Sequence, residues 1–592
     1  MASSLFFTRN FNEVVTREVV DQIKKNFHAE YGILPGKQQV MSWEGSINNL
    51  KNIISPGTAV FMELKFPIGL ERADYLLMRH GEAKVIEVKG WKKYERVDKY
   101  TVRGDSDLHG DPCYQMENYV SKLNNFHSAS STIKFSGAVY MYQTTDGNEC
   151  KILYNGKELE NDLQALPYEP ATCNDVMAIE NGTFQVGRSL VNFVRCNMKS
   201  IMENASQSFL NSGFGLSTEQ IFILRDIMKS LMEKDNRIFL ISGGMGSGKT
   251  LLALNILFSS IEKGYGSLLA YRNNRLINTL RKVVGPKFSP LLVYYSTGAK
   301  ANFRGLGERN FDQSKLQNVS IIIYDESQRM TRDVIKTCMK RQVTSVFFYD
   351  EDQILIGDEE GDRETFEKYA KETGRTVVKY NLDGFYRVNG GRKYEEFIKS
   401  IFSGNVSGIP EEYDFRTFDQ IKPMLGYLES IKSQRPMGRV PKIALLASFT
   451  RSDGRKEKRR IFDPEIDWLM DEKTEYPSYW LGQRDPLKYC ASIYGSQGFE
   501  SDYIGLIWGE DLVWRNGWNI QPDKIMDKIG GGNSLKSLSK TDPKKAMKLL
   551  INRYRVMLTR GMKGTTVYFE DSETFRHIEC IKNRAAILGQ IS

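Results

Sequence analysis

The sequence predicts an α/β protein in which an N-terminal mixed sheet is followed by two units built on parallel sheets. Three observations lead to this prediction: the chain has 592 residues, 41% of them are hydrophobic and 26% charged, and strand-like runs alternate with helix-like stretches along its length. At about 100 to 200 residues per domain, this length requires several cores. The composition is that of a globular protein and excludes a disordered or collagen-like chain. We expect three domains, over residues 1–205, 206–392 and 393–592.

The first domain is predicted from short apolar runs separated by helix-like stretches, a pattern typical of a small mixed α/β domain. The strand-like runs cover residues 59–64, 74–78, 84–89, 137–142 and 150–154. The sequence then becomes polar and contains Gly and Ser between about 197 and 216, which indicates a domain boundary.

The second and third domains are predicted from strands rich in β-branched and aromatic residues. These runs cover residues 237–242, 319–325, 345–350, 443–449, 503–508 and 565–569. Each is followed by a turn or a helical segment, which is the order expected of a parallel sheet with crossover helices. The stretch from about 390 to 440 separates the strands into two groups, so we expect two αβα units in series.

Charge and cysteine content narrow the class of protein. Lys and Arg total 82 and Asp and Glu total 73, a net charge of +9. This excess permits a polyanionic partner, and it is equally compatible with general solubility. Seven cysteines without a CxxC pair argue against a disulfide framework and a zinc knuckle. Because no apolar run approaches about 18 residues, we expect a cytoplasmic protein that does not bind a membrane.

A phosphate-binding loop is predicted in the middle of the chain. The strand at 237–242 leads into GGMGSGKT and then into the helical LLALNILFSSI. Glycines allow backbone N–H groups to surround a β-phosphate, the helix N-terminus adds its positive dipole end, and the lysine reaches the β and γ oxygens. The predicted ATP and Mg²⁺ ligands of this loop are Gly243, Gly244, Gly246, Ser247, Gly248, Lys249 and Thr250, the last through its hydroxyl group.

Paired carboxylates end the strand in VSIIIYDESQ, where a parallel strand would deliver them to the carboxyl edge of the sheet. We expect Asp325 to hold Mg²⁺ through water and Glu326 to polarise the attacking water, because phosphoryl transfer requires an oriented nucleophile and neutralised charge. Asp-Glu after a strand is more often a helix cap, and the upstream phosphate loop is what favours the nucleotidase interpretation.

Further motifs follow one another in a fixed order between about 215 and 575: STEQ, YRNNR, FFYDEDQ, GFYRVN, IYGSQGFESDYIGLIWG and NRYRVMLTRGMKGTTVYF. In this order they resemble the motifs of superfamily 1 helicases, which have two RecA-like domains, and within that group the bacterial proteins with schlafen-like P-loop domains. The residues to which the resemblance assigns roles are Gln220 for adenine, Arg272 and Asn273 for the nucleic-acid strand, Asp350 and Gln353 for sensing the γ-phosphate, Arg387 and Arg560 as arginine fingers, and Gln497, Gly498 and Glu500 as the Gln-Gly-x-Glu motif.

A physical argument, independent of the resemblance, also favours a role for Arg387 and Arg560 in hydrolysis. Charge that develops on three phosphoryl oxygens requires cations from outside the phosphate loop, and an arginine from a neighbouring domain couples domain closure to hydrolysis. Tyr494 stands where many relatives have His, and Ser327 replaces a common Ala. Only about fifty residues separate Arg387 from the next strand, whereas unwinding helicases usually insert a large domain there, so we expect translocation rather than processive unwinding.

A second site is predicted near the N-terminus, in ERADYLLMRHGEAKVIEVKGW. This segment predicts two strands joined by a turn at Gly81, with Asp74 on the first and Glu87 and Lys89 on the second. Two-residue spacing places Glu87 and Lys89 on one face, while their apolar neighbours point into a core. Two carboxylates beside an ammonium can hold a divalent metal and position water for phosphodiester hydrolysis.

This pattern, with QMENY at 115–119, resembles the RecB-like branch of the PD-(D/E)xK nucleases, whose fold is restriction-endonuclease-like. The resemblance implies that Asp74 and Glu87 bind the metal, that Lys89 is catalytic, and that Gln115 belongs to the helical Gln-x-x-x-Tyr motif. Trp91 and the lysines after it are equally compatible with a strand-binding lip and with a buried ring beside solvated lysines.

Together these patterns predict an ATP-dependent nucleic-acid nuclease and translocase with ATP and Mg²⁺ as cofactors, DNA favoured over RNA as partner, and a possible homo-oligomer or defence-system partner protein. Fusions of this kind resemble proteins of bacterial anti-phage defence. Two alternatives stay open: an ATP-switched nucleic-acid sensor that does not cleave, and an RNA-directed nuclease.

Overall fold

The computed structural model describes residues 4–31, 34–66, 71–97, 101–105, 107–144, 152–182, 184, 209–211, 214–244, 246–272, 277–278, 280–281, 289–296, 305–308, 311–382, 391–404, 406–411, 413–433, 441–448, 466–469, 473–496, 499 and 501–591. The chain divides into two compact units, one of Met1–Gly187 with Asn204–Phe222 and one of Arg188–Glu203 with Ile223–Ser592. The predicted α/β class is confirmed: one mixed sheet is followed along the chain by two parallel sheets of six strands each.

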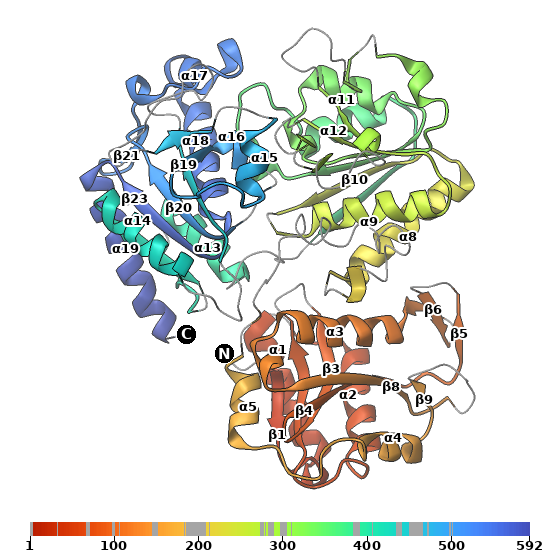
Figure 1. The fold of residues 1–592 in the computed structure, drawn as a ribbon. Helices are drawn as coiled ribbons and strands as arrows, with labels where there is room; N and C mark the ends of the chain where they lie inside the picture. The colour runs from red at the N-terminus through yellow and green to blue at the C-terminus, as the bar shows by residue number, and fades with distance from the viewer. Residues whose placement is uncertain are drawn as a thin grey trace. The chain divides into compact units, whose positions relative to one another are not determined.

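The first unit is built on a sheet with strand order β1-β2-β3-β4-β8-β9 (Figure 1). The strands are β1 (Ser4–Thr8), β2 (Ala59–Lys65), β3 (Arg72–Arg79), β4 (Glu82–Lys89), β8 (Lys134–Met141) and β9 (Ile152–Leu153). Pairs from β1 to β4 are antiparallel, whereas β4 pairs with β8 and β8 with β9 in parallel. The mixed sheet predicted for this part of the chain is therefore present.

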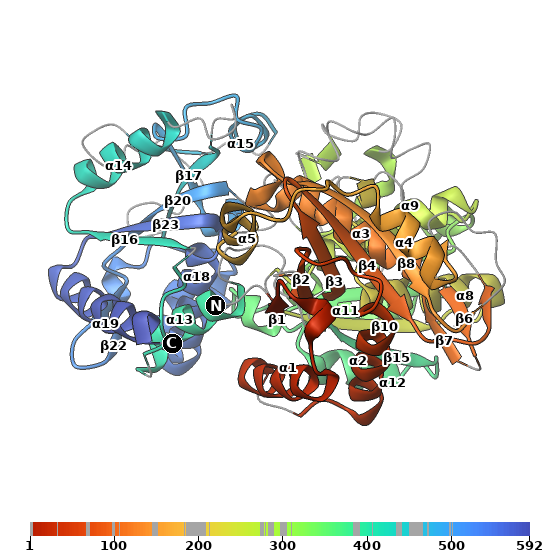
Figure 2. The same ribbon diagram turned by 90° about the horizontal axis from the view of Figure 1, so that it is seen from below.

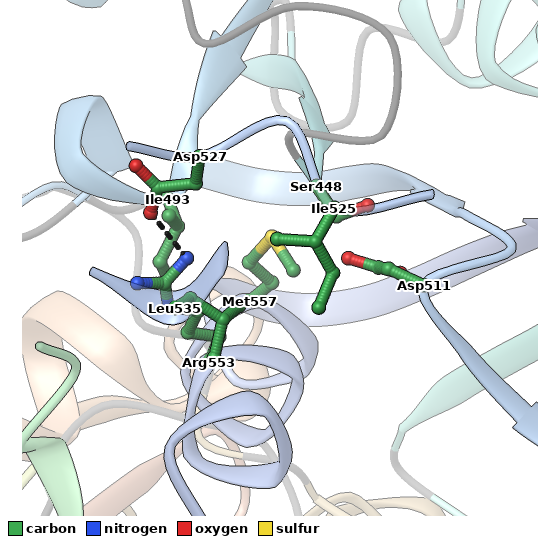
Figure 3. A pocket seen from close by; sticks show the side chains of 8 residues that line it. All are labelled: Ser448, Ile493, Asp511, Ile525, Asp527, Leu535, Arg553 and Met557. Carbon is green, nitrogen blue, oxygen red and sulfur yellow. Dashed lines mark hydrogen bonds and ion pairs between the residues drawn. The ribbon is translucent and has the colours of Figure 1, made fainter. Parts of the chain in front are cut away.

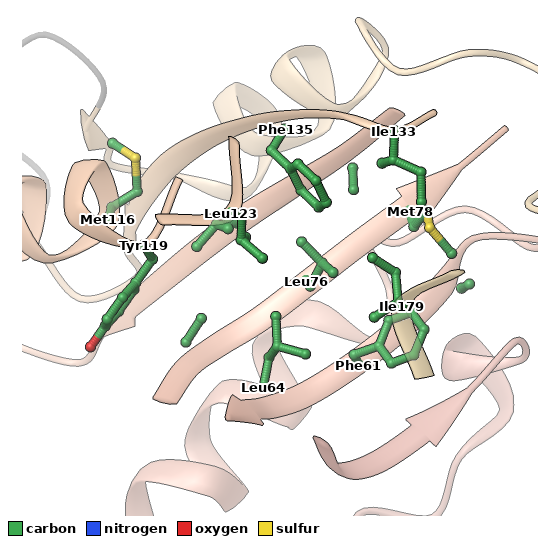
Figure 4. Packing of buried hydrophobic residues seen from close by; sticks show 14 of the residues in the cluster. Phe61, Leu64, Leu76, Met78, Met116, Tyr119, Leu123, Ile133, Phe135 and Ile179 are labelled. Atoms are coloured by element: carbon green, nitrogen blue, oxygen red, sulfur yellow. The ribbon is translucent and has the colours of Figure 1, made fainter. Parts of the chain in front are cut away.

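Both faces of this sheet are covered. Apolar side chains of α1 (Thr16–Tyr31), α2 (Lys37–Leu50) and α4 (Gly156–Leu163) share one core with the strands. Side chains of α3 (Pro112–Phe126) and α5 (Cys173–Glu180) share the core of the other face, which Figure 4 shows around Leu76 and Leu123. A burial pattern of six consecutive buried residues in β4 follows from this arrangement, because both faces exclude water.

The β3–β4 hairpin turns at Gly81, whose φ of +68° is the left-handed conformation that glycine adopts without steric cost. Ile86 and Val88 lie in the core on the side of α1 and α2, as the two-residue spacing predicts. Beyond the hairpin, β5 (Tyr94–Arg96), β6 (Thr101–Gly104) and β7 (Asp107–Gly110) form a small antiparallel sheet.

The second unit contains a first parallel sheet of order β12-β11-β13-β14-β10-β15. Its strands are β10 (Ile238–Gly243), β11 (Ser267–Tyr271), β12 (Leu292–Tyr294), β13 (Ile321–Tyr324), β14 (Thr344–Tyr349) and β15 (Val377–Leu382), with helices α9 (Lys249–Glu262), α11 (Arg332–Met339) and α12 (Arg363–Lys371). α8 (Thr218–Glu233) precedes β10. The three strands predicted here, β10, β13 and β14, lie in the interior of the sheet, so their carboxyl ends meet at one edge.

A second parallel sheet follows, of order β16-β23-β20-β17-β19-β18. Its strands are β16 (Asp414–Phe418), β17 (Ile443–Ala447), β18 (Asp467–Trp468), β19 (Tyr489–Ser492), β20 (Ser501–Trp508) and β23 (Gly561–Phe569). The helices are α13 (Gly391–Ser403), α14 (Ile421–Ser433), α15 (Glu475–Trp480), α16 (Ile493–Ser496), α17 (Leu535–Thr541), α18 (Pro543–Leu558) and α19 (Ser572–Ile591). Figure 2 shows α14 on one face of the sheet and α18 and α19 on the other, and β21 (Leu512–Trp514) pairs with β22 (Trp518–Ile520) outside it.

None of the helices in the described ranges combines the length and the apolar character that crossing a bilayer requires.

Candidate functional site

The loop between β10 and α9 has the backbone of a phosphate cradle. Gly246 and Gly248 have φ of +77° and +81°, a region that favours glycine, and Gly248 caps the helix that begins at Lys249. A Cβ on Gly243 would lie 2.5 Å from Ser247 Oγ, whereas one on Gly244 would meet no atom within 4 Å. The loop is therefore close-packed at its base, open at Gly244, and backed by a helix N-terminus that attracts anions.

Lys249 is held inside this loop. Its Nζ donates hydrogen bonds to the carbonyl oxygens of Gly243 and Gly244, at 2.6 and 2.7 Å, and lies 3.7 Å from Asp350 Oδ2. The ammonium thus stands between the loop and the carboxyl end of β14, where a bound phosphate would lie beside a cation.

Thr250 and Asp325 form the predicted magnesium pair. Thr250 Oγ1 donates to Asp325 Oδ2 at 3.0 Å. Burial and the neighbouring Glu326 charge raise the pKa of Asp325 to about 6, against the opposing hydrogen bonds from the Glu326 N–H and from Thr250. A hydroxyl and a desolvated carboxylate at one strand end are the oxygen donors that Mg²⁺ prefers, so these residues fit the ion.

Glu326 has a left-handed backbone, with φ of +53°. Its carboxylate accepts a hydrogen bond from Gln328 Nε2 at 2.6 Å, and its carbonyl oxygen accepts one from the Tyr295 hydroxyl at 2.8 Å. Non-glycine residues in this region cost free energy and concentrate at functional sites. Gln328, which the sequence analysis missed, also accepts from the Asp350 N–H through Oε1 at 3.3 Å and so links the ends of β13 and β14.

Gln353 and Arg560 meet, although they are 207 positions apart. Gln353 Nε2 donates to Asp350 Oδ2 at 2.6 Å, and Arg560 Nη2 donates to Gln353 Oε1 at 3.1 Å. Arg560 is 1% exposed. A residue from the second parallel sheet therefore reaches the predicted γ-phosphate sensor of the first, as an arginine finger would.

Gln220, which the resemblance assigns to adenine, forms hydrogen bonds at the start of α8. Gln220 lies in the first unit, where its Oε1 accepts from the Ser217 N–H at 3.1 Å and its N–H donates to Ser217 Oγ at 3.3 Å. These reciprocal bonds form a capping box at the start of α8. Arg387 lies outside the described residues, as do Asn273, Gln497, Gly498 and Glu500. The proposed roles of all of these in binding stay predictions.

In the first unit, Asp74, Glu87 and Lys89 come together. Lys89 Nζ donates to Glu87 Oε1 at 2.7 Å and lies 3.9 Å from Asp74 Oδ2, which also accepts from the Val88 N–H at 2.8 Å. Two carboxylates from adjacent strands therefore share one ammonium, the juxtaposition that the hairpin pattern predicts.

The electrostatics of this cluster suit a cation. Burial, and then the charge of Asp74, raise the pKa of Glu87 to about 8, although Lys89 opposes the shift. Burial lowers the pKa of Lys89, and the charges of Glu87 and Asp74 outweigh this and raise it overall. Glu87 Oε2 is buried and has no hydrogen-bond partner among the residues that the structure describes, and an unsatisfied carboxylate oxygen of this kind fits a divalent metal.

The metal shell would be incomplete without water or substrate. In the part of the chain that the structure describes, no three His, Cys, Asp or Glu side chains are grouped closely enough to hold an ion alone. If a metal binds here, Asp74 and Glu87 would supply two protein ligands, and further oxygen ligands would come from solvent or from a phosphodiester, as is usual for Mg²⁺.

Helix α3 carries both residues of the predicted Gln-x-x-x-Tyr motif. Tyr119 is buried, and its pKa is raised by burial and by the charges of Glu87 and Glu71. Gln115 Nε2 donates to Thr218 Oγ1 at 3.1 Å. A catalytic role for Gln115 stays a prediction.

Sequence analysis also missed Glu63. This residue of β2 accepts from Trp43 Nε1 at 2.7 Å and pairs with Arg72, and burial raises its pKa with a further contribution from Asp74. A single acid in the apolar run AVFMELK was the available signal. Arg72 compensates the charge of this buried carboxylate.

Trp91 is half-buried. It stacks on His109, with ring centroids 4.7 Å apart, and lies 6.0 Å from Lys89 Nζ. The two interpretations of this aromatic residue, a strand-binding lip and a packed ring, both fit this position.

Several solved structures resemble the chain. The solved structures that resemble the chain include the arterivirus nonstructural protein 10 helicase (10% identical, 59% of this chain and 64% of that one, TM-score 0.27). They also include Pif1 helicase from Candida albicans (12% identical, 62% and 99%, TM-score 0.28) and Bacteroides Pif1 bound to ssDNA (12% identical, 61% and 94%, TM-score 0.26).

An uncharacterized protein of Saccharomyces cerevisiae is 26% identical over 185 residues, which are 30% of this chain. The chain spans 39% of the length of that yeast protein. Residues 236–571, which include the phosphate loop, Asp325, Gln353 and Arg560, match the family model of the Schlafen group 3 DNA/RNA helicase domain. The chain therefore belongs to the Schlafen group 3 helicase family.

Proposed function

We propose that this protein is an ATP-driven nucleic-acid translocase whose N-terminal unit is a metal-dependent nuclease. The nuclease part is carried by one observation: Asp74, Glu87 and Lys89 converge, and the buried Glu87 Oε2 has no hydrogen-bond partner within the described ranges. The translocase part rests on the family and on the contact between Arg560 and Gln353.

In the nucleotide site, the loop N–H groups and Lys249 would bind the phosphates, and Thr250 and Asp325 would hold Mg²⁺. The ion would neutralise charge on the phosphate oxygens. Glu326, fixed by Gln328, orients the attacking water, while Arg560 stabilises the negative charge of the transition state from the second sheet.

In the N-terminal site, Asp74 and Glu87 would hold a divalent metal that polarises a phosphodiester oxygen. Lys89 lies within reach of both carboxylates, so its ammonium can orient water or the scissile phosphate. These are the elements that cleavage of a phosphodiester bond requires.

DNA is the proposed polymer, with RNA as the alternative. The test uses the full-length protein and labelled double-stranded DNA, single-stranded DNA and RNA, each incubated with Mg²⁺ in the presence and absence of ATP. We expect cleavage that requires Mg²⁺, together with nucleic-acid-stimulated ATP hydrolysis. Resemblance to defence nucleases supports a cytoplasmic role against invading nucleic acid. Infection assays with the Asp74→Ala and Lys249→Ala variants would test this role.

Two variants separate the activities. Asp74→Ala should abolish cleavage and preserve ATP hydrolysis, and Lys249→Ala should abolish ATP hydrolysis. Asp107→Ala and Lys263→Ala, which replace exposed residues of the same units, are the matched controls. Cleavage that persists in Asp74→Ala would refute the nuclease assignment, and binding without cleavage by the wild type would favour an ATP-switched sensor.

A further inference from the structure

The backbone of the loop that follows β14 is held by hydrogen bonds to a buried carboxylate of the same loop. Glu359, whose side chain is 0% exposed, accepts the N–H groups of Leu355 and Ile356 through Oε2, at 2.7 and 3.2 Å. One buried carboxylate thereby fixes the backbone two residues after Gln353.

The same carboxylate also accepts hydrogen bonds from residues that follow two other strands of the first parallel sheet. Glu359 Oε1 accepts from Arg329 Nε at 3.0 Å and from Arg272 Nη1 at 3.3 Å. Arg329 follows β13 and Arg272 follows β11. A buried carboxylate is stable only when its charge is compensated, and here two guanidinium groups and two N–H groups compensate it.

On its other side the loop is held by the second parallel sheet. Arg553 of α18 is 3% exposed, and its Nε and Nη2 donate to the Leu355 carbonyl oxygen at 3.0 and 2.8 Å. Asn552 Nδ2 donates to the Ile354 carbonyl oxygen at 3.1 Å. Leu355 therefore has its N–H bound to Glu359 and its carbonyl oxygen bound to Arg553.

Arg553 is itself fixed by the residues around it. Nη1 donates to Asp527 Oδ2 at 2.6 Å, as Figure 3 shows, and Nη2 donates to the Tyr494 hydroxyl at 2.7 Å. The Tyr494 hydroxyl donates to Asp527 at 2.7 Å, and the guanidinium groups of Arg553 and Arg329 lie 5.3 and 6.0 Å from its ring. Displacing Leu355 would remove the carbonyl acceptor of Arg553 Nε, a buried donor, which is costly.

We propose that Glu359 and Arg553 are positioning residues for ATP hydrolysis, which hold Gln353 against Asp350 and Arg560 through the backbone of residues 354–356. Neither residue touches the nucleotide loop, and both act on the segment that carries Gln353. This inference rests on the ATP hydrolysis of the proposed function.

The test compares Glu359→Gln and Arg553→Met with wild type in the full-length protein, measuring kcat and KM for ATP hydrolysis and the Kd of a fluorescent ATP analogue. Both variants should lower kcat about tenfold, the effect of losing one charge-assisted hydrogen bond, and leave Kd within about twofold. Glu360→Gln is the matched control, because Glu360 pairs with Arg332 on the surface. It should hydrolyse ATP like wild type.

Thermal unfolding is recorded for each variant, and Tyr494→Phe provides a test that removes only one hydroxyl group. It should lower kcat with unchanged Kd, and Arg553→Lys should restore part of the rate lost in Arg553→Met. An unchanged kcat in Glu359→Gln or Arg553→Met, or a parallel loss of kcat and nucleotide affinity, would overturn the inference. Wild type that hydrolyses no ATP would instead overturn the proposed function itself.

Discussion

At the scale of single residues, both candidate sites contain a buried carboxylate whose pKa is raised. Asp325 and Glu87 are buried carboxylates whose pKa values are raised to about 6 and about 8, in each case chiefly by burial and then by a neighbouring acid. In each case the charge of a lysine opposes this shift, Lys249 for Asp325 and Lys89 for Glu87. Burial makes a carboxylate costly to ionise in the absence of a cation, so the free energy gained when a divalent ion binds is larger there than at the surface.

Glu326 is the residue whose replacement should separate nucleotide binding from hydrolysis. Glu326→Gln preserves a side chain that Gln328 can contact, but it removes the negative charge that orients water. We expect kcat for ATP hydrolysis to fall about 10² to 10⁴-fold with little change in the Kd of ATP. Steady-state kinetics with equilibrium binding measures both, with the exposed Glu372→Gln as the control. A variant with wild-type kcat would show that another group orients the water.

At the scale of elements, a buried histidine lies at the C-terminal end of α3 in the first unit. His127 follows α3 and is 3% exposed, and its Nδ1 accepts the Ala129 N–H at 3.3 Å. The ring also packs edge-on against Phe135 and Phe184. Accepting a hydrogen bond requires the neutral ring, and burial lowers the pKa of His127 to about 4.

This lowered pKa predicts a loss of stability in acid. Between pH 6.5 and pH 4 the unfolded chain binds a proton on His127 that the folded chain does not, so the free energy of unfolding falls as the pH falls. The loss between pH 7 and pH 5 should be about 2 kcal/mol. Hydrogen exchange of β8 and α3 amides at the two pH values measures it. In His127→Asn, whose side chain can still accept from Ala129, this part of the pH dependence should disappear; equal pH dependence in both proteins would contradict the assignment.

At the scale of the whole molecule, the two parallel sheets of the second unit would share the proposed nucleotide site. Arg560 enters it from the second sheet, and Arg555 of α18 lies 3.0 Å from Asp352. Lys545 donates to the Gly357 carbonyl oxygen at 2.9 Å. The contacts of α18 converge on the loop after β14, so a change in nucleotide state at Gln353 would be transmitted to the second sheet if Gln353 senses the γ-phosphate as we propose.

Arg560→Ala tests this sharing. Losing an arginine that stabilises the transition state should lower kcat about 10³-fold or more, while ATP, which the loop of the first sheet binds, retains its affinity. The measurement is ATP turnover against binding of a labelled analogue, with Arg576→Ala on the surface of α19 as the control. A proportional loss of affinity would show that Arg560 contributes to binding rather than to the transition state.

Local sequence was sufficient for several features of the fold and of the candidate sites. Glycines followed by Lys249 between an apolar strand and a helix predict the loop, because a turn of that kind depends on neighbouring residues. The two-residue period of β4 predicts that Glu87 and Lys89 share a face, for the same reason. Parallel strands are predicted because every apolar run is followed by a turn or a helix.

Tertiary structure decided the rest, because periodicity specifies which face a residue occupies but not which strand ends meet. Glu359 and Arg553 are 194 positions apart in the sequence. No local pattern indicates that both bind Leu355. Gln220 illustrates the same limit, since its letters match an adenine-reading motif and only the structure shows that its side chain accepts the Ser217 N–H at the start of α8. The sequence by itself determined the phosphate loop, the parallel strands and the acidic hairpin, whereas the buried polar links around them depend on packing between distant segments.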